Sequence, residues 1–249
     1  MVPRDITRSI YGLCKFNYSD DGGVAVGVLS AQARRRIYNY SMDDLSQIAV
    51  SVCRVKVKNQ PLVKALVSRV SEDSVRDMRS VSIVNLMSAF SRWSVVGGSW
   101  KFLADELAQR LASGSSPPVL SRDDMLSAIM SYSFPHIGSA HEVLFSSVSE
   151  SLLHPEGREP LSADQVCRYV KACARTQYRN LSTLAYCAQS LRSGEGNSID
   201  HHLSNEKVLQ LCIGLDKLGA EMKEVDEAIL KRGLRSLPQR TGVTWFKKK

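Results

Sequence analysis

The sequence lacks the features that mark a membrane protein or a disulfide-rich secreted protein. None of the apolar runs in its 249 residues approaches the roughly 20 residues that a membrane span needs. Its six cysteines form no Cys-x-x-Cys pair and fall mostly inside apolar helical patterns. They therefore indicate reduced core residues in a non-secreted protein, and we expect no membrane partner.

Motifs for nucleotide, metal or catalytic chemistry are missing as well. The Gly-Gly pair at 97–98 has no nucleotide-loop spacing and no following Lys-Ser/Thr, so it predicts a turn between helices. His136 and His141 have the wrong spacing for one helix face, and the adjacent His201 and His202 would diverge. No serine, cysteine or carboxylate constellation recurs with the spacing that catalysis needs. We expect a protein that is not an enzyme, without metal, cofactor or small-molecule substrate.

What the sequence does contain is a repeat. Six segments look like the first helix of a two-helix unit, and each opens on an apolar residue, which we call the anchor. The anchors are Ile6, Leu45, Ile83, Met125, Val166 and Val208, at intervals of 39, 38, 42, 41 and 42 residues. A period in this range is typical of a stacked helical array.

The starts of these segments also recur. Serine stands four places before four of the anchors, as Ser41, Ser121, Ser162 and Ser204. Three of these serines have Asp44, Asp124 or Gln165 three places later. This is the spacing of a capping box, so each serine is predicted to begin a helix.

Positions counted from the anchor separate into core and surface. At +4 and +7 stand Ile10, Ala49, Met87, Ile129, Val170, Cys212 and Leu13, Val52, Phe90, Tyr132, Cys173, Leu215, which with the anchor form an apolar stripe at helical spacing. At +6 every copy has a small residue: Gly12, Ser51, Ala89, Ser131, Ala172 and Gly214. The stripe predicts the core, and the small residues predict close approach of a neighbouring helix.

The fold predicted is all-α, an α-solenoid of about six antiparallel helix hairpins of roughly 38–42 residues each. Its units lie near residues 1–39, 40–77, 78–118, 119–160, 161–202 and 203–237, and a basic, aromatic tail follows at 238–249. In the first unit we expect helices over residues 4–16 and 24–38. Because residues 1–16 already belong to a unit and include Asp5, they do not resemble an Arg-rich transit peptide.

Positions +2 and +9 project nearly opposite the apolar stripe and, in a stack, would align as a ridge. The candidate RNA-binding residues on it are Arg8, Gln47, Asn85, Arg168 and Gln210 at +2, and Lys15, Arg54, Arg92, Arg175 and Lys217 at +9. Phe134 takes the +9 place in the fourth unit, and with Pro135 it predicts a shortened helix and an interrupted ridge. A basic row beside amides suits a phosphate backbone with bases next to it, while a cation near a helix end also simply offsets the macrodipole.

Further basic residues extend this pattern. Lys171 and Arg179 join Arg168 and Arg175 on one side of the fifth unit, with no acid expected among them. Three further lysines close the tail: Lys247, Lys248 and Lys249. The tail either threads along RNA by stacking and charge or is a disordered solubilising end. The run at 34–36, Arg-Arg-Arg, either meets an anion or complements the end of its helix. The net charge of +8 favours a polyanionic partner.

The starts Ser41-Met-Asp-Asp-Leu45 and Ser121-Arg-Asp-Asp-Met125, with their apolar continuation, resemble the helical-repeat proteins of organelles: the octotricopeptide, RAP-associated and FAST-kinase-like arrays. The resemblance covers the whole chain but is one of repeat style, and no RAP-type terminal domain follows residue 237. It implies RNA binding in mitochondria or plastids, in transcript maturation or on an organellar ribosome.

Our functional expectation is a non-catalytic protein that binds rRNA as a structural or peripheral component of the mitochondrial ribosome, among other proteins of that particle. One alternative is a mitochondrial RNA processing or editing factor. A second is a protein–protein scaffold of the armadillo or TPR type, whose basic residues are merely solvated. Salt dependence separates RNA binding from a peptide-binding groove.

Overall fold

The computed structural model describes residues 2–16, 23–55, 59–113, 120–134, 137, 141–153, 160–193 and 203–234. Its regular elements in these ranges are all helices, which confirms the all-α prediction. The first helices of the six pairs are α1 (Pro3–Lys15), α3 (Met42–Arg54), α6 (Ser80–Arg92), α8 (Arg122–Tyr132), α10 (Ala163–Thr176) and α13 (Asn205–Leu218). Their second helices are α2 (Val24–Arg35), α4 (Gln60–Arg69), α7 (Ser99–Ala112), α9 (Glu142–Leu153), α11 (Leu181–Ser193) and α14 (Lys223–Lys231).

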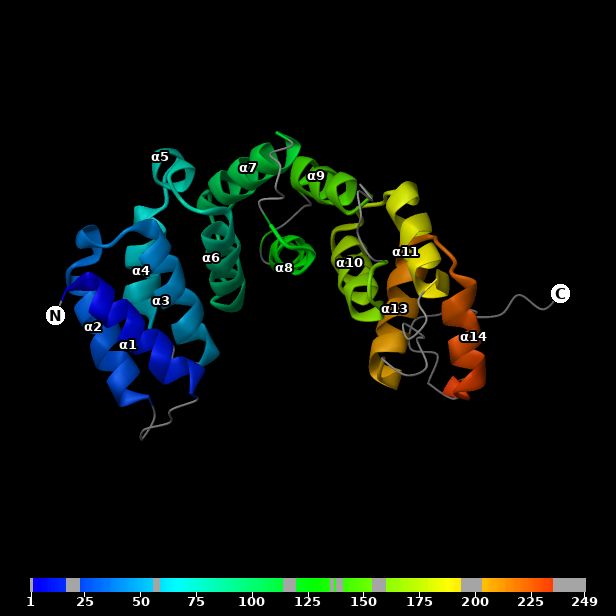
Figure 1. The fold of residues 1–249 in the computed structure, drawn as a ribbon, viewed down its shortest axis with the longest axis horizontal. Helices are drawn as coiled ribbons and strands as arrows, with labels where there is room; N and C mark the ends of the chain where they lie inside the picture. Colours follow the sequence, from blue (N-terminus) through cyan, green and yellow to red (C-terminus); the bar gives the residue numbers. More distant parts are fainter. Residues whose placement is uncertain are drawn as a thin grey trace.

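The helices form two layers that follow an arc (Figure 1). Consecutive first helices pack on one another from α1 through α3, α6, α8 and α10 to α13. The second helices form the other layer, in which α2 contacts α4, and α7 and α9 link α5 to α11. In the middle of the arc, α6, α8 and α10 lie on its inner side and α7 and α9 on its outer side. Each first helix therefore packs mainly on the first helices of the units next to it.

The core lies between the two layers, where the apolar stripe predicts it. The anchors and the residues at +4 are all buried, and so are those at +7 except Leu13, which packs against the core from a partly buried position. Of the small residues at +6, those of the second to sixth units are buried as well. A methyl group added to Gly214 would meet Val170 Cγ1 at 2.8 Å, so α13 approaches α10 at a distance that only glycine permits at this point.

The helices begin where the serine signals place them. Ser41, Ser121, Ser162 and Ser204 are all N-caps whose hydroxyl oxygens accept a backbone N–H three residues later. At α10 the box is reciprocal, because Gln165 Oε1 also accepts from the Ser162 N–H at 3.0 Å. These caps satisfy backbone donors that would otherwise be unpaired at the helix start.

One expectation about helix extent is wrong. The second helix of the first unit ends at Arg35 rather than residue 38, and a 3₁₀ turn (η1, Ile37–Asn39) follows it, because burying Ile37 and Tyr40 turns the chain toward the core. The second unit also contains an unpredicted short helix, α5 (Glu72–Arg76). By contrast, α8 has only 11 residues and ends before Phe134, as expected for the fourth unit.

Candidate nucleic-acid interface

Stacking of the first helices places position +9 of one unit over the end of the first helix before it. Burial raises the pKa of the Cys14 thiol, and the positive charge of Arg54 from the next unit partly offsets that rise. Arg92 acts in the same way on Cys53, whose pKa burial raises to about 12. The Arg175 guanidinium lies 5.3 Å from the centre of the Phe134 ring. Three junctions therefore share one register.

Five cations occupy this repeat position along the layer of first helices. We call Lys15, Arg54, Arg92, Arg175 and Lys217 the inner cationic row. All five are exposed, and none forms an ion pair with an acid in the described part of the chain. Each occupies the last or the penultimate place of its helix, so it also complements the negative end of the macrodipole.

The row is interrupted at the fourth unit. Phe134 is half-buried there, directly after the short α8, and the Arg175 guanidinium covers its ring. At this place in the row, Phe134 therefore contributes an aromatic ring instead of a positive charge. An Arg stacked on an aromatic ring is a common partner for nucleic-acid bases.

Position +2 has a different environment. Gln47, Asn85, Arg168 and Gln210 are half-buried, whereas Arg8 is exposed. Gln47 Nε2 reaches Ser51 Oγ at 3.4 Å. Gln210 Nε2 donates to Glu206 at 2.9 Å, and Gln210 Oε1 accepts from Lys171 at 2.9 Å. The amides at Gln47 and Gln210 thus make contacts within and between helices.

Arg168 is the clearest case of a candidate residue engaged within the fold. Its guanidinium donates to Asp123 Oδ1 at 2.8 Å, to the Asp123 carbonyl at 3.0 Å and to Ser127 Oγ at 2.7 Å. Because Asp123 and Ser127 belong to α8, this side chain joins α10 to the helix before it. The expectation that this side carries no acid is wrong, because Asp123 of the fourth unit pairs with Arg168 and Asp164 lies one turn before Arg168 in α10.

The remaining cations of the fifth unit differ in exposure and in the contacts that they make within the fold. Arg179 Nη2 donates to the Gly219 carbonyl at 3.1 Å, which links the end of α10 to the end of α13. Lys171 is half-buried and bonded to Gln210. Arg175 keeps an exposed guanidinium above Phe134. Among the four, Arg175 is the residue best placed to meet a ligand.

The opposite ends of the first helices carry acids, a feature that sequence reasoning overlooked. Three junctions repeat the same contact, in which a cation of the next unit pairs with the acid two places before an anchor. The pairs are Arg79 with Asp43 at 2.9 Å, Arg168 with Asp123, and Lys207 with Asp164. The signal was present, since Asp43, Asp123 and Asp164 share one repeat position.

Asp43 shows how the protein holds such an acid ionised. Burial alone would raise the pKa of its carboxyl group, but hydrogen bonds from Ser82 and Arg79 outweigh burial and lower the pKa below 3.8. Asp43 Oδ1 also accepts the backbone N–H of Arg79, at the start of α6, at 3.1 Å. The first-turn acids therefore join the units, while the inner cationic row stays open to solvent.

Burial favours the protonated form of the cysteine thiols. Burial raises the pKa of Cys167, Cys173 and Cys212 to about 12, like that of Cys53, so all four are neutral at physiological pH. Within the described ranges no three His, Cys, Asp or Glu residues gather as a possible metal site. His136, His201, His202 and the tail lysines Lys247, Lys248 and Lys249 lie outside those ranges.

No helix among the described residues is both long and apolar enough to cross a membrane. Searches of protein-family models and of curated proteins found no match for the chain. The candidate interface therefore rests on the geometry of the chain itself.

Proposed function

We propose that the chain is a non-catalytic helical-repeat module that binds RNA along its inner cationic row. The observation that carries the proposal is the shared repeat position of five cations on five of the six first helices, exposed and not ion-paired within the described ranges: Lys15, Arg54, Arg92, Arg175 and Lys217. Neighbouring packed helices lie about 8–10 Å apart, so the row offers cations at repeated steps, with a gap at the fourth unit. A linear polyanion is the ligand whose charges repeat in the same way.

The interruption at Phe134 supports RNA over other polyanions. Stacking on an aromatic ring or on a guanidinium plane suits an unpaired base, and Arg175 above Phe134 presents both groups together. The net charge of +8 favours the same partner at longer range, through attraction that precedes contact.

The resemblance to organellar helical-repeat proteins extends this proposal to the cellular setting. We propose rRNA as the bound RNA and the mitochondrial ribosome as the particle, with neighbouring ribosomal proteins as further partners. A role in mitochondrial RNA processing or editing uses the same surface. Sedimentation of the tagged protein with ribosomal particles, followed by sequencing of crosslinked RNA, separates these two roles.

The test of RNA binding compares two variants that lose the same charge. The row variant replaces Arg54, Arg92 and Arg175 with Gln. The control variant replaces Arg76, Lys101 and Arg192 with Gln; these residues are exposed too, but each pairs with an acid. Fluorescence anisotropy with a single-stranded RNA, over a range of salt concentrations, gives the affinity of each.

Five phosphate contacts predict that the logarithm of the binding constant falls with the logarithm of salt with a slope of roughly −3.5. The row variant is expected to lose at least about tenfold in affinity and to flatten the slope by about 2, while the control variant binds like the wild type. Equal losses in both variants would mean that only net charge matters. A wild-type affinity that barely responds to salt would favour the peptide-binding scaffold.

A further inference from the structure

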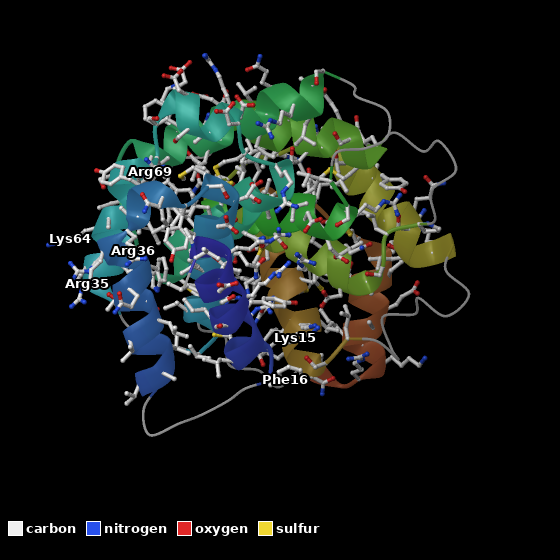
Figure 2. All side chains as sticks on the ribbon, turned by 60° about the vertical axis from the view of Figure 1, so that its left-hand side comes forward. Lys15, Phe16, Arg35, Arg36, Lys64 and Arg69 are labelled. Carbon is white, nitrogen blue, oxygen red and sulfur yellow. The ribbon has the colours of Figure 1, made fainter. Side chains whose placement is uncertain are left out.

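A second basic surface lies on the layer of second helices, away from the inner cationic row. It is formed by α2, the turn after it, and α4, and we call it the outer basic surface. Its members are Arg34, Arg35, Arg36, Tyr38, Lys64 and Arg69. In Figure 2, Arg35, Arg36, Lys64 and Arg69 lie together on one side of the molecule, while Lys15 lies near the far end of α1.

The charge of this surface is of one sign. Neither α2 nor α4 contains an acidic residue. Arg34, Arg35, Arg36 and Lys64 are exposed, and in the described part of the chain none of them is ion-paired. Complementing the end of a single helix needs one or two cations, so a cluster drawn from two helices and a turn exceeds that role.

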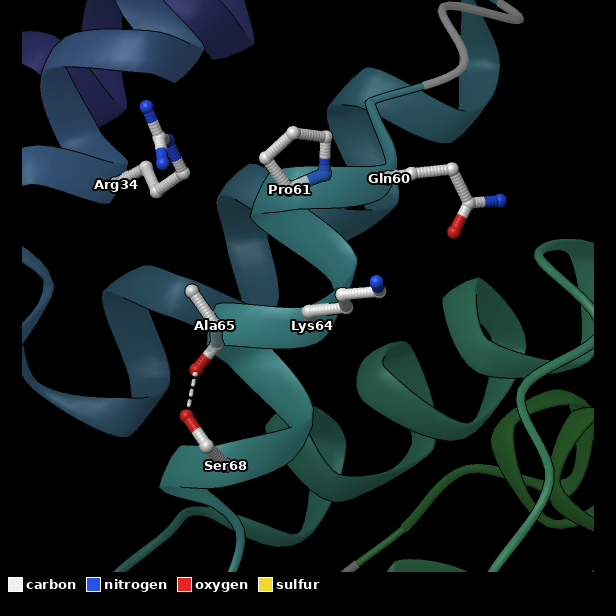
Figure 3. A pocket seen from close by; sticks show the side chains of 6 residues that line it. All are labelled: Arg34, Gln60, Pro61, Lys64, Ala65 and Ser68. Atoms are coloured by element: carbon white, nitrogen blue, oxygen red, sulfur yellow. Dashed lines mark hydrogen bonds between the residues drawn. The ribbon is translucent and has the colours of Figure 1, made fainter.

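The surface is also hollowed. A hollow of about 550 Å³ is lined by Arg34 from α2 and by Gln60, Pro61, Lys64, Ala65 and Ser68 along α4. Figure 3 shows Arg34 approaching from its own helix while the other five residues follow α4. Ser68 Oγ donates to the Ala65 carbonyl at 2.9 Å. The hollow is shallow and largely open to solvent, so it suits an extended ligand lying along α4 rather than an enclosed small molecule.

An exposed aromatic ring completes the surface. The Tyr38 side chain stands in η1 and is 76% exposed. The Arg69 guanidinium lies 5.0 Å from the centre of its ring, and among the described residues Arg69 Nε has no hydrogen-bond partner. An exposed aromatic ring with a cation at one face can stack on a nucleic-acid base through its other face.

From these features we propose that the outer basic surface binds a single-stranded segment of RNA, with a base stacked on Tyr38 and phosphates at Arg34, Arg35 and Lys64. An acidic peptide would use the cations but gain little from the ring, and the ring and hollow together therefore favour a nucleotide. The inference rests on the proposed function in that the chain binds RNA, but its location is independent of the inner cationic row.

The test uses the full chain and three charge-matched variants. The outer variant replaces Arg34, Arg35 and Lys64 with Gln; the row variant and the control variant are those defined above. All nine positions are exposed, so unchanged circular dichroism and thermal melting are expected. The probes are an oligouridine of about 10 nucleotides and one of about 40 nucleotides, because one compact binding site covers roughly 4–16 nucleotides.

For the long probe, the outer variant is expected to bind at least about fivefold more weakly than the wild type, and its salt slope to flatten by about 2. Tyr38→Ala is expected to weaken binding about 5- to 10-fold without changing the salt slope, because stacking involves no phosphate. Crosslinking of 4-thiouridine RNA is expected to label Tyr38 in the wild type and to lose that label in the outer variant.

Three results would overturn the inference, and each differs from the others. If the outer variant binds the long probe like the wild type while the row variant does not, RNA binding stands and the second surface is not used. If oligoglutamate of matched charge displaces RNA from the outer basic surface as well as RNA itself does, the surface fits an acidic protein. If the wild type binds neither probe, the proposed function fails together with the inference.

Discussion

At position +6, a single missing methyl group decides how closely two first helices approach. Gly12 and Gly214 occupy this position in the first and sixth units, but their surroundings differ. A Cβ on Gly12 would meet nothing within 4 Å, whereas one on Gly214 would meet Val170 Cγ1 at 2.8 Å and Ala174 Cβ at 3.6 Å. The difference follows from packing, since α13 has the preceding helix α10 on that side.

The two glycines therefore predict opposite effects of the same substitution. Gly12→Ala should raise the free energy of unfolding by about 1 kcal/mol, because alanine favours a helix without a clash. Gly214→Ala gains the same propensity but forces Val170 away in a filled core, which costs about 1–3 kcal/mol. Urea denaturation of both variants should show a difference of at least about 1 kcal/mol. Equal shifts would show that α10 moves aside freely.

Arg168 and Arg92 differ in their role: Arg168 joins two helices, whereas Arg92 faces solvent. Arg168, with 26% of its side chain exposed, bonds to Asp123 and Ser127, whereas Arg92 is exposed and without an ion-paired acid in the described part of the chain. A double-mutant cycle of Arg168→Met and Asp123→Asn should give a coupling of about 0.5–1 kcal/mol. Arg92→Met should change the free energy of unfolding by less than about 0.5 kcal/mol. Absence of coupling would remove Arg168 from the junction.

At the scale of helices, the sequence predicts starts better than ends. The serine caps are local, since the hydroxyl and the N–H that it accepts lie three residues apart, and so Ser41, Ser121, Ser162 and Ser204 could be recognised directly. The start of α5 was missed because Ser71 and Ser74 cap each other reciprocally, without the usual Glu or Gln. The end of α2 was missed because it depends on burying Ile37, a tertiary effect.

In the candidate site, too, local features could be predicted from the sequence, whereas contacts between helices could not. Exposure of the inner cationic row could be predicted, because a residue opposite the apolar stripe faces away from the second layer. The partners of Arg168 and Lys171 could not, because they belong to α8 and α13 and only the stack brings them near.

The junction between α3 and α6 gives a prediction that depends on pH. The pKa of Asp43 is lowered in the folded protein, so its ionised form adds stability above the ordinary value of 3.8, and this stability is lost as the pH falls through the folded pKa. Asp43→Asn should cost about 1 kcal/mol at neutral pH. Urea denaturation at pH 7 and at about pH 2.5 should show this gap shrinking in acid. A gap that persists unchanged would mean that the charge of Asp43 is not what holds Arg79.

At the scale of the whole molecule, each helix pair packs chiefly on its neighbours in the chain. Leu211 is buried in α13, and Leu211→Ala should cost about 2–5 kcal/mol locally. Hydrogen exchange followed by mass spectrometry should then become faster in α13 and α14, while α1 and α3 keep wild-type protection, because stability in stacked repeats is a sum of neighbouring terms. Faster exchange throughout would indicate one cooperative unit.

The arrangement of the two layers in an arc also determines how the molecule can bend. Since the described helices form six pairs along the arc, a rotation of a few degrees at each junction would add along the array and change the distance between its ends. A polymer lying along the inside can therefore set the curvature of the protein, and the stiffness of each junction decides how much bending that requires.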